Sequence, residues 1–317
     1  MENNLMPGAK MVSKMLALEV YPNLKDVDFK ILRAVELNMR YYEWVPLEVI
    51  ARFARMELDS VSHRLGKLDN WSLVIRRSDI GYIGYQLTIH GYDALAIRAL
   101  ARKGIIRGLS STQIGVGKEA DVYVALTPQD ERIAVKFNRI GLRTSFTRIK
   151  LYRREFIDKR HISWLYVSRL VAEREYEALR LLSSIAKVPK PIAWNRHVVA
   201  MELIDGVELV ELRDSDLSRG EAERILDSVL EEYKKIVKFG IIHSDLSFYN
   251  IVLRNSGDIL IIDWPQYVTT SFPQAEYYLE RDLRVLLNSF ERKWRIKRNW
   301  GTIWEEFRKA MHESLRE

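Results

Sequence analysis

The sequence contains no cysteine in its 317 residues. This absence excludes disulfide bonds and cysteine-ligated zinc, and it favours a reducing compartment. No apolar run approaches the roughly 18 residues that a membrane-spanning helix needs. The N-terminal residues also lack the basic segment and the apolar segment that form a signal peptide. We therefore expect a cytoplasmic protein without a membrane anchor and without a disulfide-linked partner.

Acidic residues are in the minority: 43 aspartates and glutamates oppose 50 lysines and arginines, which gives a net charge of +7. One segment carries much of this excess, because residues 138–170 contain nine basic residues and two acidic ones. A basic balance favours a phosphate-rich partner such as nucleic acid, although many soluble proteins are mildly basic.

Three helical patterns followed by a hairpin pattern occupy the first part of the chain. The first helix is expected at Asp28–Arg40, the second from Pro46, and the third after a cap at Asp59 or Ser60. The apolar face of the second helix would contain Leu47, Ile50 and Phe53. This order resembles a winged helix-turn-helix, which binds either nucleic acid or another protein. Nucleic-acid contacts would come from the third helix and the wing, through His63, Arg64, Lys67, Arg76 and Arg77.

The stretch IIHSDLSFYNIVL at residues 241–253 and the stretch IIDWPQ at residues 261–266 together indicate a phosphoryl-transfer site. Asp245 would orient or deprotonate the attacking hydroxyl or water. Asn250 and Asp263 would hold magnesium through hard oxygen ligands. His243 is expected to brace the loop by hydrogen bonding.

Upstream segments supply the other parts of such a site. Gly115 and Gly117 would let backbone approach a phosphate, although Ala120 stands where a third glycine completes the usual pattern. Lys136 lies in an apolar strand and needs anionic partners there. Glu175 is the expected helix partner, with Glu173 and Glu177 as alternatives on other faces.

The ordered set of motifs resembles the protein-kinase-like fold and, within it, the RIO family of atypical kinases. Within the RIO family, the chain resembles the subfamily that has an N-terminal winged helix (Rio-two). The segments that carry this resemblance are residues 111–123, the basic insertion, MELIDG at 201–206, HSDLSFYN at 243–250 and IDWPQ at 262–266. Two residues depart from the family pattern, Ser244 for glycine and Trp264 for phenylalanine. The D-F-G and A-P-E motifs of ordinary peptide kinases do not occur.

The resemblance implies an α+β chain with a winged-helix domain followed by a minimal bilobal kinase domain. The predicted segments are a winged-helix domain at 1–91, a connecting helix and linker at 92–108, an N-lobe at 109–200 with the basic insertion at about 138–168, and a C-lobe at 201–317. Nucleotide would be bound by Ile114, Gly115, Val116, Gly117, Lys118, Val122, Ala134, Lys136, Met201, Glu202, Ile204, Glu208 and Ile262.

The same resemblance implies ATP and Mg²⁺ as cofactors, with Mn²⁺ as an alternative metal, and a role in maturing the small ribosomal subunit. Its precursor and rRNA would be the partners of a monomeric enzyme. The phosphoacceptor would be a serine of the basic insertion, with Ser145 as the candidate, or Asp263 itself. Two other functions stay open: a small-molecule phosphotransferase of the aminoglycoside or choline kinase type, and an ATP-binding rRNA scaffold with little turnover.

Overall fold

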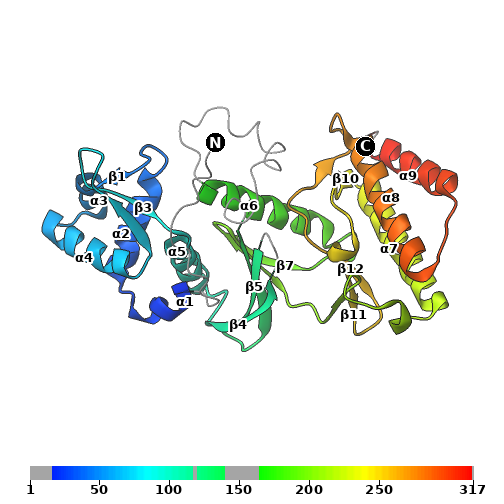
Figure 1. Cartoon of the computed structure of the whole chain (residues 1–317), viewed down its shortest axis with the longest axis horizontal. Coiled ribbons are helices and arrows are strands. Elements are labelled where there is room, and N and C mark those ends of the chain that lie inside the picture. Colours follow the sequence, from blue (N-terminus) through cyan, green and yellow to red (C-terminus); the bar gives the residue numbers. More distant parts are fainter. Residues whose placement is uncertain (1–15, 117–119, 140–163, 316–317) are drawn as a thin grey trace, which may run out of the picture. The chain divides into compact units, whose positions relative to one another are not determined.

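The computed structural model describes residues 16–116, 120–139 and 164–315 (Figure 1). The chain divides into two compact units, the first formed by 1–131 and 139–167 and the second by 132–138 and 168–317. Most of the basic insertion, including Ser145, lies outside the described residues. The domain boundaries expected after residues 91, 108 and 200 remain predictions.

The first unit begins with the winged-helix arrangement that the sequence predicts. Its helices pack around a core in which Ile31, Val61 and Leu65 are fully buried. A small antiparallel sheet of order β1-β3-β2 forms the wing. The elements are α1 (Leu16–Val20), a 3-10 turn (Tyr21–Asn23), α2 (Asp26–Asn38), β1 (Val45–Pro46), α3 (Leu47–Ala54), α4 (Leu58–Asn70), β2 (Val74–Arg77) and β3 (Gly84–Leu87).

Three expectations about the second and third helices are wrong. Phe53 is 48% exposed, because the short helix α3 turns Ala51 and Ala54 toward the core instead. The helix α4 starts at Leu58 after Glu57, and no side chain caps it, so Asp59 and Ser60 lie inside its first turn. Strand pairing of Pro46 with Gly84 also delays the start of α3 by one residue, to Leu47.

A long helix and a β-hairpin complete the first unit. Thr88 caps the N-terminus of helix α5 (Ile89–Arg102), where its side chain accepts a hydrogen bond from the backbone N–H of Gly91. Strands β4 (Gly108–Val116) and β5 (Ala120–Leu126) pair in antiparallel register.

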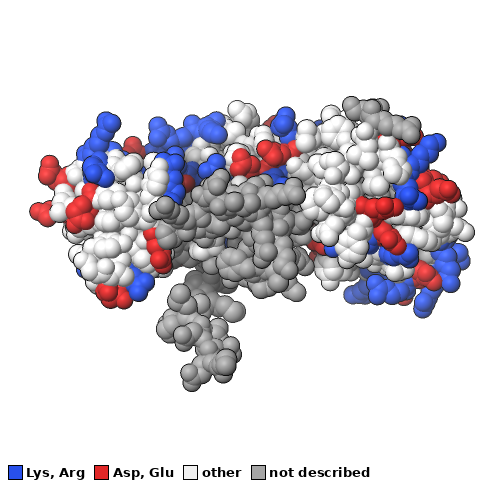
Figure 2. Space-filling model, turned by 90° about the horizontal axis from the view of Figure 1, so that it is seen from above, with Lys and Arg blue, Asp and Glu red and all other residues white. Residues whose placement is uncertain are grey.

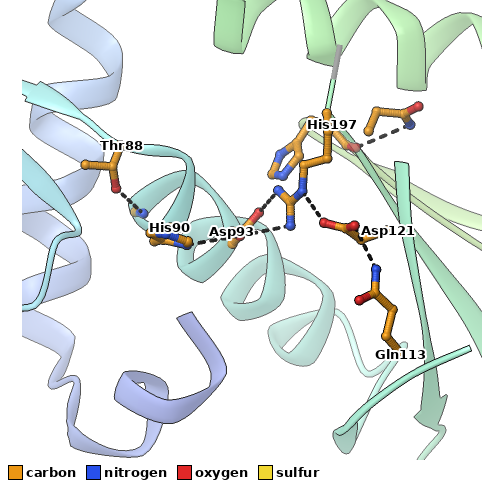
Figure 3. A network of polar contacts seen from close by, with 9 residues as sticks. Thr88, His90, Asp93, Gln113, Asp121 and His197 are labelled. Atoms are coloured by element: carbon orange, nitrogen blue, oxygen red, sulfur yellow. Dashed lines mark hydrogen bonds and ion pairs between the residues drawn. The ribbon is translucent and has the colours of Figure 1, made fainter. Parts of the chain in front are cut away.

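A buried cluster joins α5 to this hairpin (Figure 3). Arg139 Nη1 donates to Asp93 Oδ1 at 2.6 Å, and its Nε donates to Asp121 Oδ2 at 2.8 Å. The other carboxylate oxygen of Asp121 accepts from Gln113 Nε2 at 2.7 Å. The side chains of Arg139, Asp93 and Asp121 are all less than 10% exposed. One guanidinium therefore neutralises carboxylates from a helix and a strand that lie far apart in the sequence.

The second unit contains a sheet of order β6-β8-β7, made by β6 (Arg132–Asn138), β8 (Val198–Glu202) and β7 (Pro191–Asn195). The long helix α6 (Trp164–Leu182) belongs to this unit from Ser168 onward. A second small sheet has the order β12-β11-β9, and the short strands β10 and β13 pair with each other. Their bounds are β9 (Gly206–Glu208), β10 (Ile241–Ile242), β11 (Ile251–Arg254), β12 (Ile259–Ile261) and β13 (Val268–Thr269).

Three amphipathic helices pack together in the second unit: α7 (Arg219–Lys238), α8 (Ala275–Trp294) and α9 (Trp300–Ser314). Ser218 and Glu221 form a capping box at the start of α7. Its apolar stripe, including Leu226, Val229 and Tyr233, is fully buried. Within the described ranges, no helix is both long and apolar enough to cross a membrane.

Candidate active site

Lys136 lies in β6 between the fully buried side chains of Val135 and Phe137. Its Nζ atom is 2.5 Å from Glu175 Oε1 and 2.7 Å from Asp263 Oδ1. Burial alone lowers the pKa of Lys136, but the two carboxylates outweigh burial and raise it above its ordinary value. The lysine is therefore a fixed cation, which suits it to anionic phosphates. The sequence predicted Glu175 as its partner but not Asp263.

The period of α6 explains why Glu175 is the glutamate that reaches Lys136. Glu175 is four residues from both Val171 and Leu179, which are buried, so all three lie on one face. Glu177 is exposed on another face, and Glu173 is half-buried. Burial raises the pKa of Glu175, and Lys136 opposes this shift.

Asp263 follows β12 with a left-handed backbone, at φ +66°. The next residue, Trp264, is fully buried, donates from Nε1 to the carbonyl of Ile261 at 2.9 Å and packs on the His243 ring. The tryptophan therefore anchors the segment after β12 with a hydrogen bond that phenylalanine cannot make.

Arg174 is a residue of the site that sequence reasoning missed. Its guanidinium donates to the carbonyls of Pro265 at 3.3 Å and Tyr267 at 2.6 Å, and it stacks on the Tyr267 ring. Because Arg174 and Glu175 are adjacent, one turn of α6 contacts both Lys136 and the segment that carries Asp263. Its only sequence signal was an arginine next to the expected glutamate.

Two buried side chains, His243 and Asn250, hold the loop that contains Asp245. His243 is buried, and its Nε2 lies 2.9 Å from the carbonyl oxygen of Ile262. This contact is the bracing role expected for His243. Asn250 Nδ2 donates to the backbone carbonyl of Asp245 at 2.8 Å. The Asp245 side chain itself is half-buried.

Asp282 of α8 is a second residue that the sequence reading missed. It is 1% exposed, and its carboxylate accepts from the backbone N–H groups of Ser244 at 2.7 Å and Leu246 at 3.2 Å. It also accepts from the hydroxyl of Tyr233 at 2.7 Å. Burial raises the pKa of Asp282, which its donors oppose. The carboxylate thus fixes both residues that flank Asp245. The sequence signal for Asp282 was an acidic residue among leucines at helical spacing. These leucines, at positions 279, 283 and 286, are buried.

Replacing Asp282 by asparagine is expected to lower the free energy of unfolding by about 1–3 kcal/mol, because an amide NH₂ would face backbone N–H donors. Urea denaturation of the variant measures this loss. Asp227→Asn is the matched control, since Asp227 is 62% exposed and pairs with Arg298 at the surface. The control should change stability by less than about 1 kcal/mol, and an equal loss in both variants would contradict the role of Asp282.

Asn250 and Asp263 fit the requirements of a Mg²⁺ site. The amide nitrogen of Asn250 donates to the Asp245 carbonyl, so the amide oxygen is the atom that could ligate a cation. The Asp263 side chain is 36% exposed and offers a carboxylate. No group of three or more histidine and acidic ligands occurs among the described residues. Mg²⁺ is commonly held by one or two protein oxygens together with substrate phosphates, and this pair matches that pattern.

The predicted adenine and ribose contacts lie at β8, β6 and β9. Met201 is buried opposite Ala134 across the sheet. The backbone N–H of Glu202 donates to the carbonyl of Lys190, so this N–H is not available to an adenine. Glu208 is half-buried, and burial, followed by repulsion from Glu211 and Asp263, raises its pKa. Ile204 and Ile262 are half-buried in the same unit.

The glycine-rich segment belongs to the first unit. Ile114 is 50% exposed on β4, Gly115 is paired with Val122, and Val116 is paired with Asp121. Gly117 and Lys118 lie outside the described residues.

The nucleic-acid candidates of the winged helix are mostly exposed. His63, Lys67, Arg76 and Arg77 are exposed, whereas Arg64 is 24% exposed and contacts Asp28 at 3.3 Å. The expectation that Arg64 points outward is therefore wrong, because a buried carboxylate on α2 holds it. On the face in Figure 2, lysine and arginine side chains are interspersed with acidic ones over the described part of the protein.

Comparisons with known proteins identify the family of this chain. The RIO domain model matches residues 121–301, and the Rio2 N-terminal model matches residues 21–103. A RIO-type serine/threonine-protein kinase Rio2 from Methanocaldococcus jannaschii is 46% identical over 80% of this chain and 92% of its own length. The rio2 serine/threonine-protein kinase of Schizosaccharomyces pombe is 34% identical over 85% of this chain and 77% of its own length.

A solved structure is similar over most of the chain. The Rio2 kinase of Chaetomium thermophilum, in an ADP/Mg²⁺-phosphoaspartate complex, has a TM-score of 0.80 and 28% identity, covering 94% of this chain and 89% of that one. The two family models, the relatives and the fold agree: the chain belongs to the RIO family of atypical serine/threonine kinases, in its Rio2 branch.

Proposed function

We propose that this kinase transfers the γ-phosphoryl group of ATP to its own Asp263 and then hydrolyses the product, acting as an ATP-driven switch. The contact of Lys136 Nζ with both Glu175 and Asp263 carries this proposal. Phosphoryl transfer needs fixed positive charge and positioning more than covalent help from the protein.

Each residue of the site has a separate role in the proposed reaction. Lys136, held by Glu175, orients the α- and β-phosphates. Asn250 and Asp263 would hold Mg²⁺, which neutralises charge on the phosphates when bound. Asp245 is placed by the contacts of its neighbours with Asp282 and accepts a proton when the attacking group is water or a hydroxyl.

The proposed reaction has two steps. A carboxylate oxygen of Asp263 attacks the γ-phosphorus, the bond from phosphorus to the β,γ-bridging oxygen breaks, and ADP leaves. Water then attacks the phosphorus of the acyl phosphate, the bond from phosphorus to the Asp263 oxygen breaks, and one of the two water protons passes to Asp245. This second step restores the Asp263 carboxylate and releases inorganic phosphate. The phosphoaspartate in the related Chaetomium thermophilum complex supports this acceptor. A serine hydroxyl, with Ser145 as candidate, is the second acceptor we consider.

The proposed setting is maturation of the small ribosomal subunit. The net charge of +7 and the basic segment at 138–170 suit a partner rich in phosphate. The winged helix has four exposed basic residues that could contact the same partner: His63, Lys67, Arg76 and Arg77.

ATP turnover with Mg²⁺, measured with and without purified small-subunit precursors, tests this function. We expect turnover that the precursors change and that Asp245→Ala abolishes. Stimulation by an aminoglycoside or by choline would instead support a small-molecule phosphotransferase. ATP binding without turnover in every condition would support an rRNA-binding scaffold.

A further inference from the structure

Ser244, the residue before Asp245, combines a left-handed backbone with nearly complete burial. Its φ is +62°, and it is 2% exposed. Its backbone N–H donates to Asp282, and its carbonyl accepts from the guanidinium of Arg281. Its hydroxyl donates to the backbone carbonyl of Gln266.

The left-handed conformation disfavours serine relative to glycine, because a Cβ atom is crowded there. The contacts with Asp282 and Arg281 use backbone atoms, so glycine could make both. What serine adds is the hydroxyl and its bond to Gln266. Serine therefore has a conformational cost at this position that glycine would not have, and among the described residues its only additional contact is the hydrogen bond to Gln266. Strained residues of this kind are found at functional sites.

This bond joins the two loops that carry the reacting groups. Ser244 is adjacent to Asp245, and Gln266 is three residues after Asp263. Arg174 anchors the second loop from α6, at the carbonyls of Pro265 and Tyr267. The Ser244 hydroxyl is one of three direct links between the loops, beside the contact of His243 with the carbonyl of Ile262 and the backbone bond from Ile262 to Asn250. It is the one that holds the part of the second loop after Asp263.

We propose that Ser244 is a positioning residue that sets the distance from Asp263 to the loop that carries Asp245 and Asn250. This inference rests on the proposed function and deepens it. Loss of the hydroxyl releases the part of the second loop after Asp263, so that Asp263 can shift relative to Asp245 while Ile262 stays bound. The affinity for the metal–nucleotide complex and the rate of phosphoryl transfer then fall together. Misplacement by about 1 Å can cost roughly a hundredfold in rate, so a partial loosening should cost about tenfold.

Two variants of the full-length protein separate this role from plain stability. Ser244→Ala removes the hydroxyl and keeps the crowded Cβ, whereas Ser244→Gly removes both. We expect a lower thermal midpoint for alanine than for glycine, because glycine relieves the backbone. Both should raise, by about threefold to tenfold, the Mg²⁺ concentration for half-maximal binding of a non-hydrolysable ATP analogue, and both should lower turnover by about tenfold.

Ser72→Gly is the matched control, because Ser72 is an exposed serine with φ +55° in the winged helix. It should raise the thermal midpoint without changing the Mg²⁺ dependence. Parent-like Mg²⁺ dependence in both Ser244 variants would overturn the inference. If the parent lacks turnover, the proposed function fails, while the Mg²⁺-dependent binding of the analogue still decides the role of Ser244. If alanine fails to fold, the glycine variant decides alone.

Discussion

Asp245→Asn is expected to lower ATP turnover by about 10²–10⁴-fold, the range lost when a general base is removed. The variant keeps the shape of the side chain and loses its capacity to accept a proton. The loop should keep its conformation, because Asp282 holds the backbone of Ser244 and Leu246 and Asn250 holds the carbonyl of Asp245. Affinity for a non-hydrolysable ATP analogue should therefore stay within about threefold of the parent. Steady-state phosphate release and calorimetric titration measure the two quantities.

Asp258→Asn is the control for this prediction. Asp258 is a carboxylate of the same unit, 55% exposed and paired with Lys187. Its replacement should leave turnover unchanged. If the turnover of Asp245→Asn were close to that of the parent, Asp245 would not be the general base.

Arg139→Met should lower the unfolding free energy of the first unit by about 3–5 kcal/mol, because removing one partner of a buried ion pair leaves an uncompensated charge. Asp93 and Asp121 would both remain buried without their guanidinium. Denaturant unfolding gives the size of the loss. Hydrogen exchange of the amides in α5, β4 and β5 should locate it, since these elements meet at the cluster (Figure 3).

Arg107→Met provides the matched control in the same unit. Arg107 pairs with Asp130, but both side chains are more than half exposed, so its loss should cost less than about 1 kcal/mol. A triple variant with Arg139→Met, Asp93→Asn and Asp121→Asn should recover part of the stability, because it removes the unpaired charges. No recovery, or equal losses for Arg107 and Arg139, would contradict the electrostatic explanation.

The spacing of apolar residues along the sequence was sufficient to predict much of the fold and the central contact of the site. Helical spacing predicted Leu47 and Ile50 on the apolar face of the second helix, and both are buried. The same spacing selected Glu175 over its two neighbours as the partner of Lys136. These successes share one cause: periodicity decides which face of an element is buried.

Contacts that depend on tertiary structure were not predictable in this way. Phe53 fits an apolar stripe but is exposed, because α3 is too short to bury every apolar position. Arg64 fits an exposed basic face but contacts Asp28 from another helix. Arg174 and Ser244 act through bonds to backbone carbonyls, which any sequence can supply, so no residue type marks the partner. Asp282 was also missed, although an acid within an apolar stripe needs hydrogen-bond donors when buried and therefore carries a signal in the sequence.

Phosphate trapping tests the central claim most directly. The parent is incubated with Mg²⁺ and ATP labelled in the γ-phosphate, and the denatured protein is treated with hydroxylamine, which cleaves acyl phosphates but not serine phosphates. We predict hydroxylamine-sensitive label that maps to Asp263, persists in Asp245→Asn, and is absent from Asp263→Asn and Lys136→Met. ATP hydrolysis by the parent with no label on Asp263, or with label confined to serine, would contradict the account.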